Sequence, residues 1–248
     1  MRPYYSHAGI TIHLGDCREL LPIPADALIC DPPYGISYKP GSGDGKCGRG
    51  TLSGGVPPAK TLREKDIVRG DDGPFDPKHL LGYPKIVLFG ANHYADKLPA
   101  MASWAVWDKR LHNSLTNDFS DCELIWTNQG GPARVFRHLW CGLLKDSEQG
   151  EQRQHPTQKP IAIMEWVIAR YCAEADVVID PYMGSGTTLI AAKKLGHAAI
   201  GIEIEEKYCE ISARRLEQEV FNWPAQVEPK KDALSIGSDT GKIIFPTK

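Results

Sequence analysis

Several features that would assign this sequence to a broad class are missing. No apolar run approaches the length of a membrane-spanning helix, and residues 1–5 lack the apolar core of a signal peptide. The seven cysteines form no Cys-x-x-Cys pair and have no companion histidine spacing, which argues against a zinc site or a disulfide framework. We therefore expect a cytoplasmic protein with reduced thiols, without a metal site and without membrane association.

An excess of positive charge is also missing. The formal net charge is -2, from 29 Lys and Arg against 31 Asp and Glu, so binding to a polyanion would need a local basic patch. The 248 residues are enough to bury one sizeable core. Short β-type segments alternate with helical ones, which predicts an α/β fold with a doubly wound, mostly parallel sheet covered on both faces.

The expected elements follow one another as far as about residue 220. Apolar runs and alternation predict seven strands, at residues 9–14, 27–30, 85–90, 103–108, 123–127, 177–179 and 197–204. Helical spacing and turn signals predict helices at residues 17–21, 160–171, 187–195 and 207–220. We expect one domain over residues 1–223, followed by a poorly ordered tail over residues 224–248.

The first motif that carries chemistry is Asp31-Pro32-Pro33-Tyr34, directly after the apolar run at 27–30. A carboxylate and a backbone carbonyl can both accept hydrogen bonds from an NH2 group, and an aromatic ring can stack on a base. The two prolines stiffen the turn that presents these groups. The alternative is that Asp31 is an ordinary turn residue at a strand end.

The second motif is Asp180-Pro181-Tyr182-Met183-Gly184-Ser185-Gly186-Thr187-Thr188. It follows an apolar strand and opens a helix, and this order brings backbone amides close to a nucleoside cofactor in doubly wound sheets. A phosphate-binding loop is excluded because the motif lacks the lysine that reaches the phosphates. Gly184 and Gly186 would let the backbone approach the cofactor.

A third phrase, His155-Pro156-Thr157-Gln158-Lys159-Pro160, precedes the glycine turn. With these three motifs the chain resembles the amino-methyltransferases of DNA that use S-adenosylmethionine (AdoMet), over roughly residues 10–216. The order, catalytic tetrapeptide first and glycine turn near the C-terminus, resembles the β class. This resemblance implies a Rossmann-like, seven-stranded methyltransferase sheet that is circularly permuted, and AdoMet as the cofactor.

The resemblance also implies a set of cofactor contacts. Glu203, at the end of a strand, would accept hydrogen bonds from the ribose hydroxyls, and Asp16 would face the adenine of AdoMet. Thr157 and Lys159 would lie near its carboxylate. Asp16 could instead be a helix N-cap, and Lys159 a solvated surface lysine. The full expected set is Asp16, Cys17, Asp31, Thr157, Lys159, Asp180, Tyr182, Gly184, Ser185, Gly186, Thr187, Thr188, Glu203 and Ile204.

The resemblance makes Asp31, Pro32, Pro33 and Tyr34 the catalytic residues. If Asp31 and the Pro32 carbonyl accept the amine protons of adenine N6, its lone pair can attack the methyl group directly on a flipped base held by Tyr34. Methylation of cytosine C5 needs a cysteine that follows a proline, and no Pro-Cys dipeptide occurs. Asp in the tetrapeptide favours adenine, while cytosine N4 methylation and a non-catalytic AdoMet-binding or DNA-binding module are the alternatives.

Two segments interrupt the alternation of strands and helices. Residues 39–65 contain seven glycines and six basic residues, and we expect a flap over DNA, with a flexible linker as the alternative. Residues 128–154 stand where β-class enzymes hold their target-recognition region, although a charged surface loop would have a similar composition. This region is short, as in the compact methyltransferases of phages and prophages.

The expected partner is double-stranded DNA, held by basic residues of these segments and of one strand end. The sequence leaves open whether the chain forms a homodimer and whether a restriction endonuclease accompanies it. The expected DNA contacts are Lys39, Lys46, Arg49, Lys109, Arg110, Arg134 and Arg137.

Overall fold

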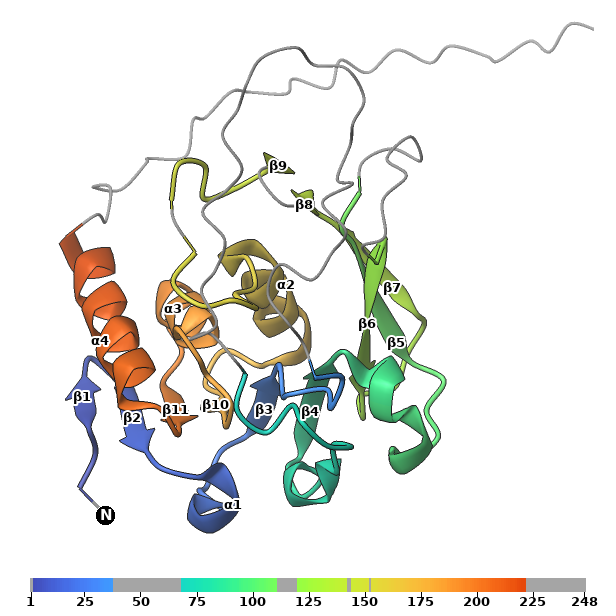
Figure 1. Cartoon of the computed structure of the whole chain (residues 1–248), viewed down its shortest axis with the longest axis horizontal. Coiled ribbons are helices and arrows are strands. Elements are labelled where there is room, and N and C mark those ends of the chain that lie inside the picture. The colour runs from blue at the N-terminus through green and yellow to red at the C-terminus, as the bar shows by residue number, and fades with distance from the viewer. Residues whose placement is uncertain (1, 38–67, 111–119, 142–143, 152, 222–248) are drawn as a thin grey trace, which may run out of the picture.

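The computed structural model describes residues 2–37, 68–110, 120–141, 144–151 and 153–221 (Figure 1). A nine-stranded sheet forms its centre, and a separate hairpin joins β8 (Trp140–Cys141) to β9 (Leu144–Lys145). The strands of the large sheet are β1 (Tyr5–His7), β2 (Ile10–Leu14), β3 (Ala27–Cys30), β4 (Lys85–Phe89), β5 (Trp104–Asp108), β6 (Cys122–Thr127), β7 (Arg134–Arg137), β10 (Val178–Asp180) and β11 (Ala199–Glu203).

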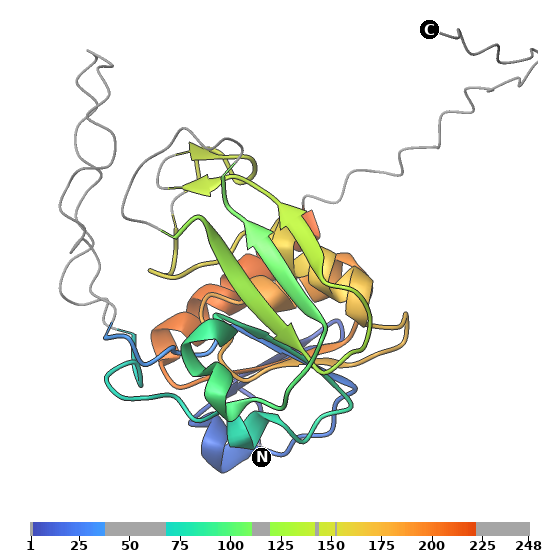
Figure 2. The ribbon, with the colours of Figure 1, turned by 90° about the vertical axis from the view of Figure 1, so that its right-hand side faces the viewer.

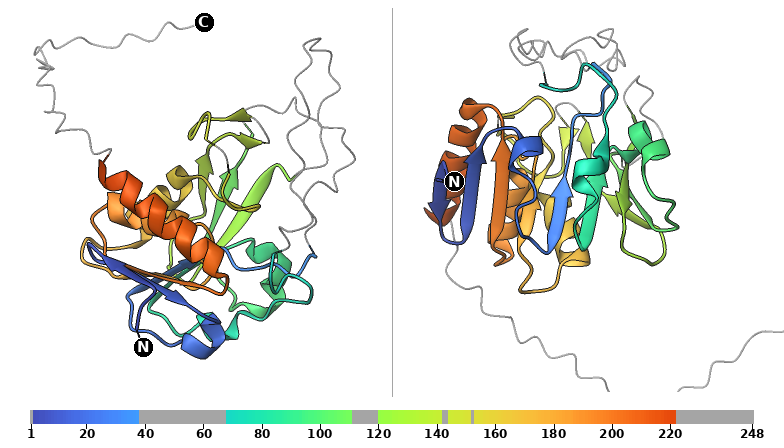
Figure 3. Two further views of the ribbon diagram at one scale, coloured as in Figure 1. Left: turned by 60° about the vertical axis from the view of Figure 1, so that its left-hand side comes forward. Right: turned by 90° about the horizontal axis from the view of Figure 1, so that it is seen from below.

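The strand order in the sheet is β1-β2-β11-β10-β3-β4-β6-β5-β7, which Figure 3 shows from below. The five consecutive strands β2, β11, β10, β3 and β4 run parallel to one another. Strand β6 reverses this direction, because it pairs antiparallel with both β4 and β5. Parallel strands covered on both faces are continuously apolar. All four residues of β3 are accordingly buried.

The prediction of seven strands was wrong, because β1 and β7 extend the sheet at its two ends. Strand β1 has three residues and pairs antiparallel with β2, while β7 has four and pairs parallel with β5. Both are short and mostly exposed edge strands, so they lack the apolar run that marks a central strand. Strand β7 lies within residues 128–154, so part of that segment belongs to the main sheet.

Among the described residues, four α-helices and two 3-10 helices cover the sheet. The α-helices are α1 (Cys17–Leu20), α2 (Ile161–Tyr171), α3 (Thr187–Lys194) and α4 (Glu206–Phe221), and the 3-10 helices are η1 (Pro77–Leu80) and η2 (Ala91–Lys97). Helices α2, α3 and α4 lie on one face, and α1, η1 and η2 on the other (Figures 1 and 3). Val167 and Leu189 pack into one apolar cluster, and Leu80 and Tyr94 into a second. The doubly wound arrangement is therefore present.

Every predicted strand and helix corresponds to an observed element, with ends shifted by no more than two residues. The residues of the expected flap, 39–65, and of the expected tail, 224–248, lie outside the described residues. Figure 2 shows the end of the sheet where β6, β5 and β7 lie side by side, with the β8–β9 hairpin beyond one end of these strands. Within the described ranges, no helix combines the length and the apolar character needed to cross a membrane.

Candidate active site

Four acidic residues stand at the ends of four neighbouring parallel strands. Asp31 directly follows β3, and Asp180 and Glu203 are the last residues of β10 and β11. Asp16 follows the end of β2 by two residues. Since β2, β11, β10 and β3 are adjacent and parallel, their carboxyl ends meet at one edge of the sheet, here called the carboxyl edge. The two principal motifs, far apart in sequence, therefore lie at the same edge.

One cavity of about 1560 Å³ lies at this edge. Its lining contains nearly all of the predicted catalytic and cofactor residues, namely Asp16, Cys17, Asp31, Pro32, Pro33, Tyr34, Thr157, Lys159, Asp180, Tyr182, Gly184, Ser185, Thr187, Thr188, Glu203 and Ile204. The volume is sufficient for a nucleoside cofactor together with part of a second substrate.

Gly186 is the predicted cofactor residue that does not line the cavity. Its φ is +79°, and a Cβ added to it would lie 1.9 Å from the Ser212 hydroxyl oxygen on α4. Glycine is thus required here because the start of α3 packs closely against α4. The approach of the Gly186 backbone to a ligand stays a prediction.

The acidic side chains at the ends of β10 and β11 accept hydrogen bonds from backbone amides of the glycine turn. Glu203 Oε2 accepts a hydrogen bond from the Gly184 amide at 3.0 Å, and Asp180 Oδ1 accepts one from the Tyr182 amide at 3.0 Å. Burial raises the pKa of Glu203. Burial also raises the pKa of Asp180 to about 7, against the hydrogen bonds from Thr188 and Tyr182. Asp180 is therefore partly protonated at neutral pH.

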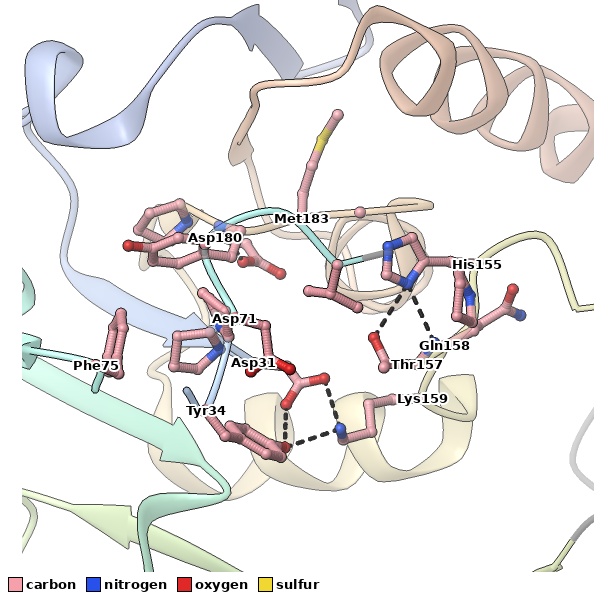
Figure 4. Close-up of a pocket in the computed structure, with 18 of the residues that line it drawn as sticks. Asp31, Tyr34, Asp71, Phe75, His155, Thr157, Gln158, Lys159, Asp180 and Met183 are labelled. Carbon is pink, nitrogen blue, oxygen red and sulfur yellow. Dashed lines mark hydrogen bonds and ion pairs between the residues drawn. The ribbon is translucent and has the colours of Figure 1, made fainter. Parts of the chain in front are cut away.

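The Asp31 carboxylate lies between Tyr34 and Lys159 (Figure 4). The Tyr34 hydroxyl donates to Oδ1, and Lys159 Nζ lies 2.5 Å from Oδ2. Each carboxylate oxygen can accept two hydrogen bonds, so these contacts leave acceptor capacity for an incoming amine.

Glu123 on β6 is a residue of this site that the sequence analysis missed. Its Oε1 lies 2.8 Å from the Tyr34 hydroxyl oxygen and 3.0 Å from Lys159 Nζ, and its Oε2 lies 2.8 Å from Lys109 Nζ. A strand of a parallel sheet would begin at the opposite edge. Because β6 is antiparallel to β4, its first residues lie at the carboxyl edge instead. The one available signal was a carboxylate near the start of an apolar run.

All three N–H bonds of the Lys159 ammonium group have acceptors. These are Asp31 Oδ2 at 2.5 Å, Glu123 Oε1 at 3.0 Å and the Tyr34 hydroxyl at 3.2 Å. The side chain is 9% exposed, so Lys159 is not a solvated surface lysine. A contact with the cofactor carboxylate, as the resemblance implies, would require the ammonium to give up one of these acceptors.

The Tyr34 ring stacks on His93 of η2, with 5.0 Å between ring centroids and 13° between ring planes. Gly90 permits this position, because a Cβ there would lie 2.1 Å from the Tyr34 ring. His93 therefore supports the aromatic member of the tetrapeptide.

Asp16 and a group of aromatic side chains form another part of the cavity wall. Asp16 Oδ1 accepts from the Arg18 amide at 2.9 Å and caps α1, so the N-cap alternative describes its contacts in this structure. The Tyr182 hydroxyl lies 2.8 Å from His79 Nε2, and the Phe75 ring packs edge-on against Tyr182. Burial lowers the pKa of His79, which favours the neutral imidazole. This wall of flat, neutral rings suits a purine.

His155 and Thr157 lie beside the glycine turn. The Thr157 hydroxyl is 3.1 Å from His155 Nδ1, and the imidazole packs edge-on against the Tyr208 ring. A Cβ at Gly184 would touch the same imidazole at 3.5 Å. Burial lowers the pKa of His155 to about 4, so the ring is neutral at physiological pH.

The predicted DNA contacts divide into three groups. Lys109 and Arg110 line the cavity, where Lys109 pairs with Glu123 and Arg110 lies 2.7 Å from Asp121. Arg134 and Arg137 are on β7 and do not line it. The other three, Lys39, Lys46 and Arg49, lie outside the described residues.

The fold is similar to that of a DNA methyltransferase of known structure. The PvuII DNA methyltransferase, described as cytosine-N4-specific, superposes with a TM-score of 0.51 at 16% sequence identity, over 86% of this chain and 88% of that chain. At this identity the likeness shows the fold alone. The chain has an α/β methyltransferase fold with a mixed sheet.

The sequence adds a family match within this fold class. Residues 107–214 match the DNA methylase family model N6_N4_Mtase. The chain is 41% identical over 86 residues to type II methyltransferase M2.DpnII of Streptococcus pneumoniae, covering 35% of this chain and 32% of that protein. It is 32% identical over 114 residues to type II methyltransferase M2.MboI of Moraxella bovis, covering 46% and 40%. These matches thus span less than half the length of either relative.

Proposed function

We propose that this chain is an AdoMet-dependent DNA methyltransferase that transfers a methyl group to the exocyclic N6 of adenine in double-stranded DNA. The observation that carries the proposal is that the amine-accepting turn at Asp31 and the glycine turn at Gly184 follow adjacent strands and line one cavity. The family match over residues 107–214 supports DNA as the substrate. The order of the two turns along the chain supports the permuted, β-class arrangement.

The residues at the carboxyl edge fit AdoMet. Asp180 and Glu203 offer carboxylates to an ammonium group and to ribose hydroxyls, and Gly184 leaves the backbone bare beside them. Tyr182 and Phe75 offer flat surfaces to an adenine ring. When bound, AdoMet would supply an electrophilic methyl carbon attached to a sulfonium.

The chain's own groups prepare the nitrogen for attack. Asp31 and the Pro32 carbonyl would each accept one N6 proton, so that the nitrogen lone pair is directed at the methyl carbon. The N6 nitrogen would form its bond to the methyl carbon as the bond from that carbon to sulfur breaks, and the electron pair of the broken bond would stay on the sulfur. The surplus N6 proton then leaves through Asp31 to water. Since the amine is inaccessible within a base stack, the adenine must be flipped out, and we propose that it packs against Tyr34.

Cytosine N4 is the alternative target, because its amine presents the same two hydrogens. The fold likeness to a cytosine-N4-specific enzyme does not decide between the bases. Family members that methylate cytosine often have serine at the position of Asp31, so the aspartate favours adenine as the target. The homodimer, the restriction endonuclease companion and the phage-like origin stay predictions from the sequence.

Transfer of label tests the proposed function directly. The protein is incubated with methyl-labelled AdoMet and duplex DNA of mixed sequence, and the DNA is digested to nucleosides. We expect the label in N6-methyldeoxyadenosine. Label in N4-methyldeoxycytidine would correct the target base, and AdoMet binding without transfer to any DNA would favour a non-catalytic module. Methylome sequencing of a methylation-free host that expresses the chain would then give the recognition sequence.

Replacement of Asp31 tests the assigned acceptor. Asp31→Asn removes the negative charge but keeps the side-chain volume, and we expect a loss of transfer of about 100-fold or more. AdoMet binding, measured by calorimetry, should change by less than about threefold, because the proposed partner of Asp31 is the amine of the base. Asp96→Asn is the control, because this aspartate is exposed and does not line the cavity. Normal transfer in Asp31→Asn would contradict the assigned role.

A further inference from the structure

Four charged side chains alternate in sign along the floor of the cavity. They run from Asp31 to Lys159, to Glu123 and to Lys109, with ion-pair distances of 2.5, 3.0 and 2.8 Å. The side chains of Asp31, Lys159 and Glu123 are 15%, 9% and 9% exposed. A buried charge is stable only when it is paired, so each member of this row depends on its neighbours.

The row joins the first and third motifs, which contain Asp31 and Lys159, to two residues outside the motifs, Glu123 and Lys109. Lys159 precedes α2, Glu123 and Lys109 come from β6 and the end of β5, and all of them line the cavity around Asp31. Lys159 is the one cation among the described residues that contacts the Asp31 carboxylate.

We propose that Lys159 and Glu123 are positioning residues of the methyl-transfer site: Lys159 holds Asp31 in the ionised form that accepts the amine proton, and Glu123 holds Lys159. This inference rests on the proposed function for its catalytic meaning. The arrangement of charges can be tested without it.

The electrostatics give Lys159 and Glu123 opposite effects on Asp31. Burial has the largest effect and keeps the pKa of Asp31 above its ordinary value, while the charge of Lys159 lowers this pKa and the charge of Glu123 raises it. Burial would lower the pKa of Lys159, but Asp31 and Glu123 outweigh burial and raise it, so the ammonium stays charged. Burial disfavours ionised Glu123, yet Lys159 and Lys109 lower its pKa to about 2. The groups that act electrostatically on Asp31 or are acted on by it are Lys159, Tyr34, Glu123, Asp180, Cys30 and Tyr94.

The test compares the pH dependence of kcat, at saturating AdoMet and DNA, in the wild type and three variants. In Lys159→Met, Asp31 loses its neighbouring cation and its pKa rises. The acidic limb of the kcat–pH profile should therefore move to higher pH by about one unit or more, and activity should be partly recovered at high pH. In Glu123→Gln, Asp31 loses an anion but keeps Lys159, so the limb should move down. Lys159→Arg keeps the charge and should leave the limb near its wild-type position.

A merely structural role would not give shifts of opposite sign. If the acidic limb of Lys159→Met stays where it is, or if Lys159→Met and Glu123→Gln shift it in the same direction, the inference is wrong. Circular dichroism and thermal melting establish that each variant folds. If Lys159→Met fails to fold, the pH profiles of Glu123→Gln and Lys159→Arg still test the inference. The acidic limb of Glu123→Gln must then move to lower pH while that of Lys159→Arg stays near its wild-type position.

A second measurement needs no activity. The protein is labelled with ¹³C at the aspartate carboxyl carbons, and the Asp31 resonance, assigned from Asp31→Asn, is titrated in the ligand-free protein. We expect Asp31 to titrate at higher pH in Lys159→Met than in the wild type, and an unchanged titration would overturn the inference. A wild type that titrates as expected but methylates no DNA would instead overturn the proposed function.

Discussion

At Asp180, burial and hydrogen bonding oppose each other. The side chain is 3% exposed, and burial raises its pKa to about 7 although Thr188 and Tyr182 donate hydrogen bonds to it. The folded-state pKa lies above the usual value of 3.8, so the folded protein binds this proton more tightly than the unfolded chain does. The resulting contribution to stability is complete below about pH 4 and is lost as the pH rises through about 7.

Replacing Asp180 by asparagine should therefore change stability in a pH-dependent way. Relative to the wild type, the Tm of Asp180→Asn should rise between about pH 5 and pH 8, because the wild type ionises a buried carboxyl over this range. The proposed AdoMet contact predicts weaker cofactor binding in the same variant at about pH 8. Differential scanning fluorimetry and calorimetry measure the two effects.

Asp176 provides a control, because folding lowers its pKa whereas folding raises the pKa of Asp180. Burial acts to raise its pKa, but hydrogen bonds from Lys85 and from the Ala173 amide outweigh burial and lower it. Its ionised form thus stabilises the fold at neutral pH, and Asp176→Asn should have a lower Tm than the wild type at about pH 8. If the difference in Tm between Asp180→Asn and the wild type did not depend on pH, burial would not raise the pKa of Asp180.

Single residues of the site could be predicted where a motif contained them. Asp31, Asp180 and Glu203 were predicted from strand ends, and all three line the cavity. Glu123 could not be predicted in this way, because its place at the carboxyl edge depends on the reversed direction of β6. The contacts of Lys159 depend in turn on Glu123, so the sequence alone gave no reason to connect this lysine with Asp31.

At the scale of elements, helix α3 is bounded by two glycines with left-handed backbone. Gly186 has φ +79° and stands at the N-cap, and Gly196 has φ +80° just beyond the C-terminal end. Their surroundings differ, because a Cβ at Gly186 would meet Ser212 whereas nothing lies within 4 Å of one at Gly196. Substitutions at these two glycines can therefore distinguish the cost of backbone strain from the cost of side-chain crowding.

Alanine substitution at the two glycines should have unequal effects. Gly196→Ala introduces strain alone, and we expect a loss of about 1 kcal/mol in unfolding free energy. Gly186→Ala adds overpacking against α4, so the loss should be about 2–4 kcal/mol. Urea denaturation gives both values. Equal losses would mean that the contact with Ser212 does not constrain α3.

Central elements were predictable because their physical signals are local. The apolar runs of β3 and β10 and the helical spacing in α2 gave the correct elements to within two residues. Strands β1 and β7 were missed because an edge strand with exposed side chains lacks a distinctive period. Their pairing with β2 and β5 is decided by tertiary contacts.

At the scale of the whole molecule, the proposed cofactor would contact segments from both ends of the described chain. Strands β2 and β3 come from the first 30 residues, and β10 and β11 from residues 178–203. A ligand that binds their common edge favours the folded state by mass action. At a concentration of 100 times its Kd, this amounts to about 2.7 kcal/mol.

We therefore expect AdoMet to raise the Tm of the intact protein. For a chain of this size the expected shift is about 5 °C or more at that concentration. Glu203→Gln should reduce the shift, since it weakens an acceptor proposed for the ribose. A protein that transfers methyl groups but shows no shift with AdoMet would place the cofactor away from these strands.

The direction of β6 has a mechanical consequence. The strand carries Glu123 at one end and continues through Asn128 toward β7, in the region expected to meet the recognition sequence. Glu123 lies 3.0 Å from Lys159 Nζ and 2.8 Å from Lys109 Nζ, so the position of β6 sets the ion pairs of both lysines. A substitution that displaced β6 within the sheet would therefore change the charges around Asp31, although no residue of β6 is close to Asp31 in sequence.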